Sequence, residues 1–351
     1  MAGGVDQQGS QAVRRAERRV RLASLQRGAA DLVKALIETP VATRVAKSAR
    51  RDPRSNRASQ LGRIAALCLA PAAVFLLILI AYPLSRVIWS AFHYVNLTNP
   101  TVAGFAGLDN FTTVLEDEHF WPSLGHTCVW TVASVAGEYG LGLASAVALA
   151  QPIRARSVFR AVIIIPWVIP IVVAGLNWTW MLTPDYGVLN LWMVKLGLLS
   201  KPFYWLGNLD TALLTVSFVN IWRSFPFYTI SLLAALMSVP REVIESAAMD
   251  GAGPVRRFVY ITMPYLKTVS LTLIFIHVIW TAINFDFIWV MTQGGPFNAS
   301  ETLPIMIYRY AMEDFDVGAA SALAMMTMGF MLAAFFVYWY GAGRSAELRE
   351  W

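Results

Sequence analysis

Three ionisable side chains interrupt long apolar stretches of this sequence: Glu138, Arg223 and Asp286. A charge inside hydrocarbon is costly, so such residues usually face the interior of a helix bundle or a water-filled cavity. Arg223 could pair with either acid, and the sequence does not say which. Two interpretations remain open, namely an ion pair or bonded network that holds helices together, and a contact with a polar solute.

Residues that would support enzymatic or metal chemistry do not converge in the sequence. The histidines show no H-E-x-x-H arrangement or other metal-ligand spacing, and no set of nucleophile and base stands out. Cys68 and Cys128 lack C-x-x-C spacing, which predicts packing residues. No G-x-x-x-x-G-K-S/T phosphate loop occurs. We therefore expect no metal, no cofactor and no catalytic residue in this chain.

The elements that position these residues are predicted to be transmembrane helices. Hydrophobic residues make up 57% of the 351 residues and charged residues only 14%, whereas a soluble domain has about a quarter charged. Hydrocarbon offers no partner for open backbone groups, so apolar stretches of about 20 residues must be helical. The sequence predicts an all-α membrane protein with six spans: Ile64–Ser85, Leu124–Ala150, Ala161–Thr183, Thr211–Val239, Thr268–Thr292 and Val317–Gly343.

The distribution of Lys and Arg predicts the orientation, because positively charged loops stay in the cytoplasm. The tail 1–63, the loop after the second span, the loop after the fourth span and the C-terminus together hold 23 Lys and Arg, and the opposite loops hold 4. Both termini are therefore expected in the cytoplasm, with a multi-pass domain in the membrane. The net charge of +6 reflects this topology, so no nucleic-acid partner is expected.

Three domains are expected from the same pattern. Residues 1–63 form a basic tail, either solvated or partly an amphipathic helix at the lipid surface. Residues 64–343 form the six-helix domain, which includes a cytoplasmic loop at 240–266, and residues 344–351 form a short C-terminal tail.

The loop 240–266 has the composition of two short helices joined by a turn. Pro240 suits the start of one helix, the glycines at 251 and 253 break it, and Pro254 starts the second. Small and charged side chains would let another protein approach closely. The small side chains are Ser246, Ala247 and Ala248, and the charged ones are Glu245, Arg256 and Arg257.

This loop resembles the EAA loop of binding-protein-dependent ABC importer permeases. That pattern is E-A-A, three residues, G, nine residues, I, one residue and L-P, and Glu245, Ala247, Gly251, Ile261 and Pro264 match it at the right spacings. Serine and methionine stand at 246 and 263, where the pattern has alanine and leucine.

Two further segments resemble the carbohydrate-uptake branch of those permeases, which includes the maltose permeases. They are Gly107–Phe111 before Phe120–Trp121, and Thr292–Pro296 followed by Glu301–Thr302. The likeness covers about residues 64 to 343.

The resemblance implies a type I ABC importer permease fold in the inner membrane of a bacterium, and alternating access driven by ATP hydrolysis in partner subunits. The implied partners are a second homologous permease in a heterodimer, two copies of an ATPase subunit that bind ATP and Mg, an extracytoplasmic sugar-binding protein and membrane lipids. In this interpretation the loop 240–266 docks on the ATPases and transmits their motion. The residues expected to carry this docking are Glu245, Ser246, Ala247, Asp250, Gly251, Arg256, Ile261 and Pro264.

Carbohydrates are bound by aromatic faces and by Asn, Asp or Arg side chains, so residues of both kinds were sought within the spans. Trp280 and Asn284 share a helical face, whereas Asp286 would lie about 200° around from Asn284. The expected pathway residues are Asn220, Trp222, Arg223, Trp280, Asn284 and Asp286, with Glu138 as a further intramembrane charge.

The predicted solute is a di- or oligosaccharide such as trehalose or maltose. Glycerol phosphate derivatives and polyamines remain alternatives, and a membrane protein without a transport role is the less favoured reading.

Overall fold

The computed structural model describes residues 53–99, 101 and 103–347. The first of its two compact units ends at Tyr82 and the second begins at Pro83. Helix α3 (Pro53–Ala91) crosses this boundary and begins earlier than the expected first span, so the helix extends into part of the predicted tail. Residues 1–52 of that tail lie outside the described residues.

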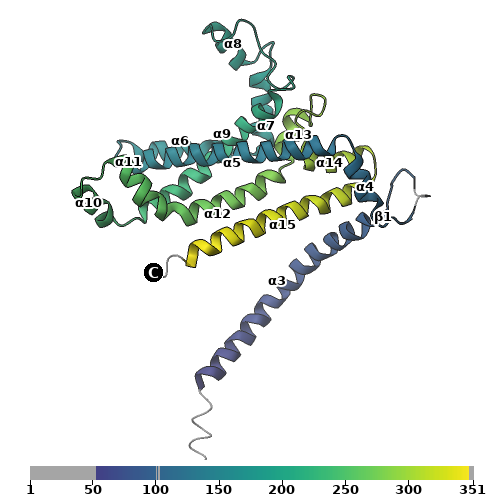
Figure 1. Ribbon diagram of the computed structural model, residues 1–351, viewed down its shortest axis with the longest axis horizontal. Helices are drawn as coiled ribbons and strands as arrows, with labels where there is room; N and C mark the ends of the chain where they lie inside the picture. The colour runs from purple at the N-terminus through teal and green to yellow at the C-terminus, as the bar shows by residue number, and fades with distance from the viewer. Residues whose placement is uncertain (1–52, 100, 102, 348–351) are drawn as a thin grey trace, which may run out of the picture. The chain divides into compact units, whose positions relative to one another are not determined.

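The second unit consists mainly of helices, which Figure 1 labels. A two-stranded antiparallel ribbon pairs β1 (His93–Tyr94) with β2 (Gly104–Phe105). The longer helices are α5 (Phe120–Ala150), α6 (Arg156–Val168), α7 (Ile171–Leu182), α9 (Ala212–Met237), α12 (Met263–Ala282) and α15 (Val317–Glu347). The shorter elements are α4 (Asp109–Glu116), α8 (Val188–Lys195), α10 (Arg241–Met249), α11 (Pro254–Arg257), η1 (Phe258–Thr262), α13 (Asp286–Thr292), α14 (Leu303–Tyr308) and η2 (Arg309–Glu313).

Within the described residues, four helices are long and apolar enough to cross a membrane, and up to six spans result if each of two bent helix pairs is one span. The third expected span is one of these pairs. It is not one helix, because α6 and α7 meet at 93° where Pro170 interrupts the backbone hydrogen bonds. The fifth expected span, Thr268–Thr292, begins and ends earlier than predicted, since the candidate span covers Pro254–Ala282 and α13 starts again at Asp286.

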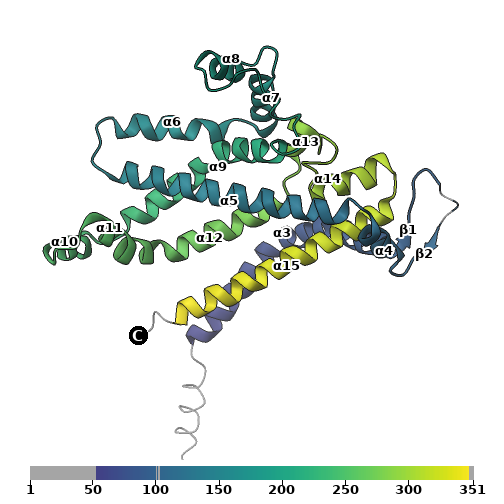
Figure 2. The same cartoon turned by 45° about the horizontal axis from the view of Figure 1, so that its top comes forward.

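Helices α5 and α9 form the most extensive pair of the bundle, and Figures 1 and 2 show them running side by side. Glycines allow their close approach. A Cβ atom at Gly142 would lie 2.4 Å from the Cβ of Tyr228, so only glycine fits there. In both views α10 lies at one end of these two helices and α13 toward the other.

Candidate functional site

A cavity of about 250 Å³ lies among α7, α9 and α12. Its lining is partly polar, although the helices around it are apolar. The lining residues are Ile171, Asn220, Arg223, Ser224, His277, Trp280, Thr281, Ile283 and Asn284.

Four of the expected pathway residues meet at this cavity: Asn220, Arg223, Trp280 and Asn284. Trp222 does not line it, and its ring instead packs edge-on against Trp178 with centroids 5.3 Å apart. Two positions along a helix turn the side chain by about 200°, which separates Trp222 from Asn220.

Asp286 does not line the cavity either, and it is exposed in the first turn of α13. Asn284 and Asp286 do not lie on one helix as expected, because α12 ends at Ala282, before both residues. Asn284 lies in the connection between the helices, where its Oδ1 accepts the N–H of Phe287 at 3.2 Å. The substrate roles of all six residues stay predictions.

A buried network beside the cavity ties three helices together. Glu138 on α5 is 1% exposed, and its two carboxylate oxygens accept hydrogen bonds from Asn220 Nδ2 at 2.9 Å and His277 Nδ1 at 2.7 Å. These partners come from α9 and α12. Glu138 therefore fits the structural interpretation, a bonded network that holds helices together.

His277 was not expected to contribute to a site. A lone histidine on an apolar helix gives no signal of a partner 139 residues away. Its Nδ1 is engaged by Glu138, while its Nε2 is buried without a hydrogen-bond partner among the described residues. Because His277 lines the cavity, this nitrogen is available to a polar group of a solute.

Arg223 forms no ion pair within the described part of the chain. Its Nε donates to the backbone oxygen of Ile169 at 3.2 Å, and its guanidinium lies 6.0 Å from the ring centroid of Phe287. Pro170, which follows Ile169, breaks the helix and leaves this carbonyl without its usual helical donor. Arg223 thus donates a hydrogen bond to the carbonyl at the helix break and places a positive charge at the cavity.

The loop 240–266 has the predicted pair of helices. Pro240 precedes α10, and Pro254 is the first residue of α11. Gly251 has φ +78°, and the bonds from Gly251 N to Ala248 O and from Ala252 N to Ala247 O close the end of α10. This is a Schellman ending, which requires a left-handed residue and so favours glycine.

The surface of this loop is exposed, and α10 and α11 bury no residue. Of the eight residues expected to dock, Ala247 and Ile261 are partly buried, and the exposed ones are Glu245, Ser246, Asp250, Gly251, Arg256 and Pro264. Large apolar side chains also point outward, with Met249 88% and Tyr260 73% exposed. Neither Met249 nor Tyr260 is among the residues expected from the sequence to carry docking.

Among the residues that the structure describes, no group of three or more His, Cys, Asp or Glu side chains is placed to hold a metal ion.

Comparison with known families gives a match over residues 139–342 to the family described as binding-protein-dependent transport system inner membrane component. This range includes the cavity and the loop 240–266.

Two curated proteins are similar over most of the chain. The sulfoquinovosyl glycerol transport system permease protein SmoG of Agrobacterium fabrum is 32% identical, over 85% of this chain and 97% of that protein. The trehalose/maltose transport system permease protein MalF of Thermococcus litoralis is also 32% identical, over 78% of this chain and 91% of its own length.

A solved structure shares the fold. It is a bacterial ABC transporter involved in the import of the acidic polysaccharide alginate, one chain of which superposes with a TM-score of 0.72 and 21% identity. The match covers 83% of this chain and 99% of that chain, which confirms the expected importer permease fold.

Proposed function

Because this chain belongs to the family of binding-protein-dependent transport system inner membrane components, we propose that it lets a di- or oligosaccharide cross the membrane as one of two different permease subunits. The observation that carries this proposal is the partly polar cavity among α7, α9 and α12. Relatives named for trehalose/maltose and for sulfoquinovosyl glycerol transport support a carbohydrate as the solute.

The cavity offers the two kinds of contact that carbohydrates need. Trp280, 57% exposed, presents an aromatic face to the C–H surface of a sugar ring. Asn284 and the Nε2 atom of His277 supply hydrogen-bonding groups for hydroxyls. A pocket that combines apolar walls with a few placed polar groups is the usual form of a small-molecule site.

Energy is proposed to enter through the loop 240–266. The exposed α10 would dock on one of two ATPase subunits that bind ATP and Mg, with Met249 and Tyr260 as apolar contacts around the charge of Glu245. Closure of the ATPases would push α10 and switch the cavity between the two sides of the membrane. An extracytoplasmic binding protein would deliver the sugar.

The chain is a multi-pass membrane protein, and the proposed orientation places both termini and α10 in the cytoplasm of a bacterium. The excess of Lys and Arg on that side supports this orientation. The basic tail before the first span would then lie next to anionic lipid.

One observation favours a second class of solute, an anionic one such as a glycerol phosphate derivative or an acidic sugar. Arg223 lines the cavity without a carboxylate partner in the described residues, so its charge is available to a phosphate, sulfonate or carboxylate. The same charge would repel a polyamine, and the nearby carboxylate of Glu138 is already engaged by two donors.

Uptake by the complete transporter in proteoliposomes tests the proposal. We would supply the binding protein with labelled trehalose, maltose or sulfoquinovosyl glycerol and measure ATP-dependent accumulation. Trp280→Ala should lower uptake about tenfold, because losing about 1.4 kcal/mol of contact energy corresponds to a factor of ten. Trp180→Ala is the matched control, since Trp180 is 60% exposed but does not line the cavity. Normal uptake by Trp280→Ala, or no accumulation of any of the three solutes, would contradict the proposal.

A further inference from the structure

A second and larger cavity, of about 660 Å³, lies at the C-terminal ends of α7 and α13. One wall comes from α7 and the segment after it, with Thr179, Thr183 and Asp185. Another comes from the loop that carries Tyr204, and a third from the turn at Gly295 and Pro296. The volume is within the range of about 300 to 1,000 Å³ that is typical of small-molecule pockets.

A single buried amide fixes the first two walls relative to each other. Asn190 is fully buried, and its Nδ2 donates to the backbone oxygens of Leu182 at 3.0 Å and Phe203 at 3.1 Å. Its Oδ1 accepts the N–H of Phe203 at 3.0 Å and the indole N–H of Trp205 at 3.2 Å. The segment before α8 and the segment after it are thus held together by one side chain.

The third wall is fixed by Ser300. Its Oγ donates to the backbone oxygen of Gly295 at 2.6 Å and lies 2.8 Å from Thr292 Oγ1. Its backbone N–H donates to Gly294 O at 3.1 Å. The walls are therefore formed before any ligand binds, which reduces the entropy lost on binding.

The chemistry of the cavity suits a sugar ring. A Cβ atom at Gly207 would lie 2.3 Å from ring carbons of Tyr204, so this glycine lies against the Tyr204 ring. Tyr204 itself remains 61% exposed. Asp185 is exposed and has no ion-pair or hydrogen-bond partner within the described residues, so its carboxylate can accept two hydroxyl donors. Thr179 Oγ1 is buried without a partner there and can bond a further hydroxyl.

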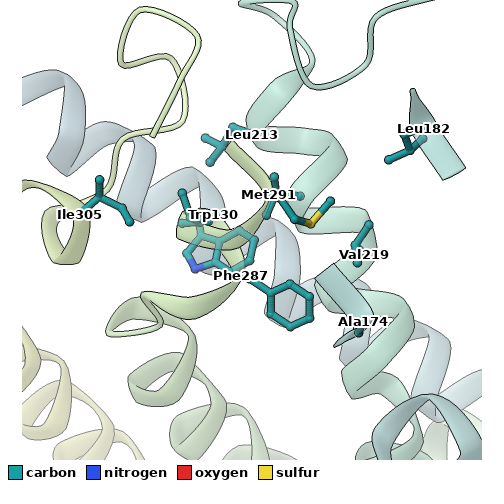
Figure 3. Close-up of a cluster of buried hydrophobic side chains, with 10 residues drawn as sticks. Trp130, Ala174, Leu182, Leu213, Val219, Phe287, Met291 and Ile305 are labelled. Carbon is teal, nitrogen blue, oxygen red and sulfur yellow. The ribbon is translucent and has the colours of Figure 1, made fainter. Parts of the chain in front are cut away.

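The two cavities follow one another along α7. Ile171 lines the first and Thr179 lines the second, which is about 12 Å along a helix at about 1.5 Å per residue. A buried apolar cluster that includes Ala174, Phe287 and Met291 lies alongside this stretch. Figure 3 shows Met291 of α13 near Leu213 of α9, and Phe287 of α13 on the side of Ala174 of α7.

We propose that the second cavity is a carbohydrate subsite, which holds a neutral sugar ring beyond the apolar cluster before the solute reaches the cavity beside Trp280. This proposal rests on the sugar-import function proposed above. Tyr204 stacks on the ring, and Asp185 and Thr179 bond its hydroxyls.

Protection of an introduced cysteine tests the subsite without relying on transport. The complete transporter, with Cys68→Ser and Cys128→Ser, receives Thr183→Cys and is labelled in proteoliposomes with a membrane-impermeant maleimide. Trehalose or maltose at four times its dissociation constant should slow labelling about fivefold, since the free fraction falls by 1 + [L]/Kd. Mannitol at the same osmolality should not. Tyr186→Cys is the matched control, because Tyr186 is exposed on the same segment but outside the lining.

A second variant shows whether the aromatic ring carries the binding. Tyr204→Ala added to Thr183→Cys should abolish protection, whereas Tyr204→Phe should keep it. Absence of protection in vesicles that accumulate the same sugar would overturn the subsite and leave the proposed function intact. Protection that persists in Tyr204→Ala, or that also occurs at Tyr186→Cys, would overturn it as well. Failure of accumulation by the unaltered transporter would count against the proposed function instead.

Discussion

Replacing Glu138 by alanine is expected to destabilise the helix bundle far more than replacing it by glutamine. The carboxylate is buried and accepts one hydrogen bond from Asn220 and one from His277. Alanine leaves both donors buried without an acceptor, at about 1–3 kcal/mol each, so the expected loss is about 2–6 kcal/mol.

Glutamine keeps most of this network. Its amide oxygen can still accept the Asn220 N–H, and its NH₂ group can donate to His277 Nδ1 once the imidazole proton moves to Nε2. Only the strengthening of the two hydrogen bonds by the negative charge is lost, so the free energy of unfolding should fall by about 1 kcal/mol.

Reversible unfolding in mixed micelles with increasing SDS measures these free energies. Thr131→Ala is a suitable control, because among the described residues the buried Thr131 hydroxyl bonds only to a carbonyl of its own helix. Hydrogen bonds between transmembrane helices can be as weak as about 0.6 kcal/mol on average. If the free energies of unfolding of the alanine and glutamine variants differ by less than about 1 kcal/mol, the sum of two such weak bonds, the buried network does not hold the helices together as expected.

Three further outcomes are expected. Gly251→Val should reduce the number of ATPase subunits that copurify with the complex, because a side chain at φ +78° costs about 1–2 kcal/mol. Gly253→Ala, at φ −64°, should retain the full number. Burial, and then the hydrogen bond to a neighbouring carboxylate, raise the pKa of Tyr310 above its usual value. The neutral Tyr310 hydroxyl therefore stabilises the folded protein below about pH 10, and this stabilisation is lost as the pH rises further. Melting curves of Tyr310→Phe should therefore depend less on alkaline pH than those of the unaltered protein. A reporter after Lys201 should be extracytoplasmic and one after Arg154 cytoplasmic, and the reverse result would contradict the orientation.

Features set by neighbouring residues were predictable from the sequence. The two helices of the loop 240–266 follow from Pro240, Gly251 and Pro254, each of which acts on its own few backbone bonds. The helical nature of the spans follows from composition in the same way. Their kinks were predictable in part, since Pro170 marks a break whose angle of 93° depends on packing.

Contacts between distant residues were not predictable. Nothing in the residues around His277 indicates that Glu138 is its partner, because the pairing depends on how α5 and α12 face each other. The end of α12 at Ala282 was missed for a related reason. The following run Ile283–Phe285 contains neither proline nor glycine, and its one local signal of a break is Asn284, a residue type that favours helix starts and accepts the N–H of Phe287.

The break before α7 links two residues that are far apart in the chain. Pro170 interrupts the helix and frees the carbonyl of Ile169, and Arg223 occupies that carbonyl with its Nε. In hydrocarbon an unsatisfied carbonyl costs several kcal/mol, so the two positions should tolerate change only in concert. A relative that lacks the proline could exchange the arginine for an uncharged residue, and its cavity would then lose its cation. The bend of one helix and the positive charge at the cavity therefore depend on the same contact.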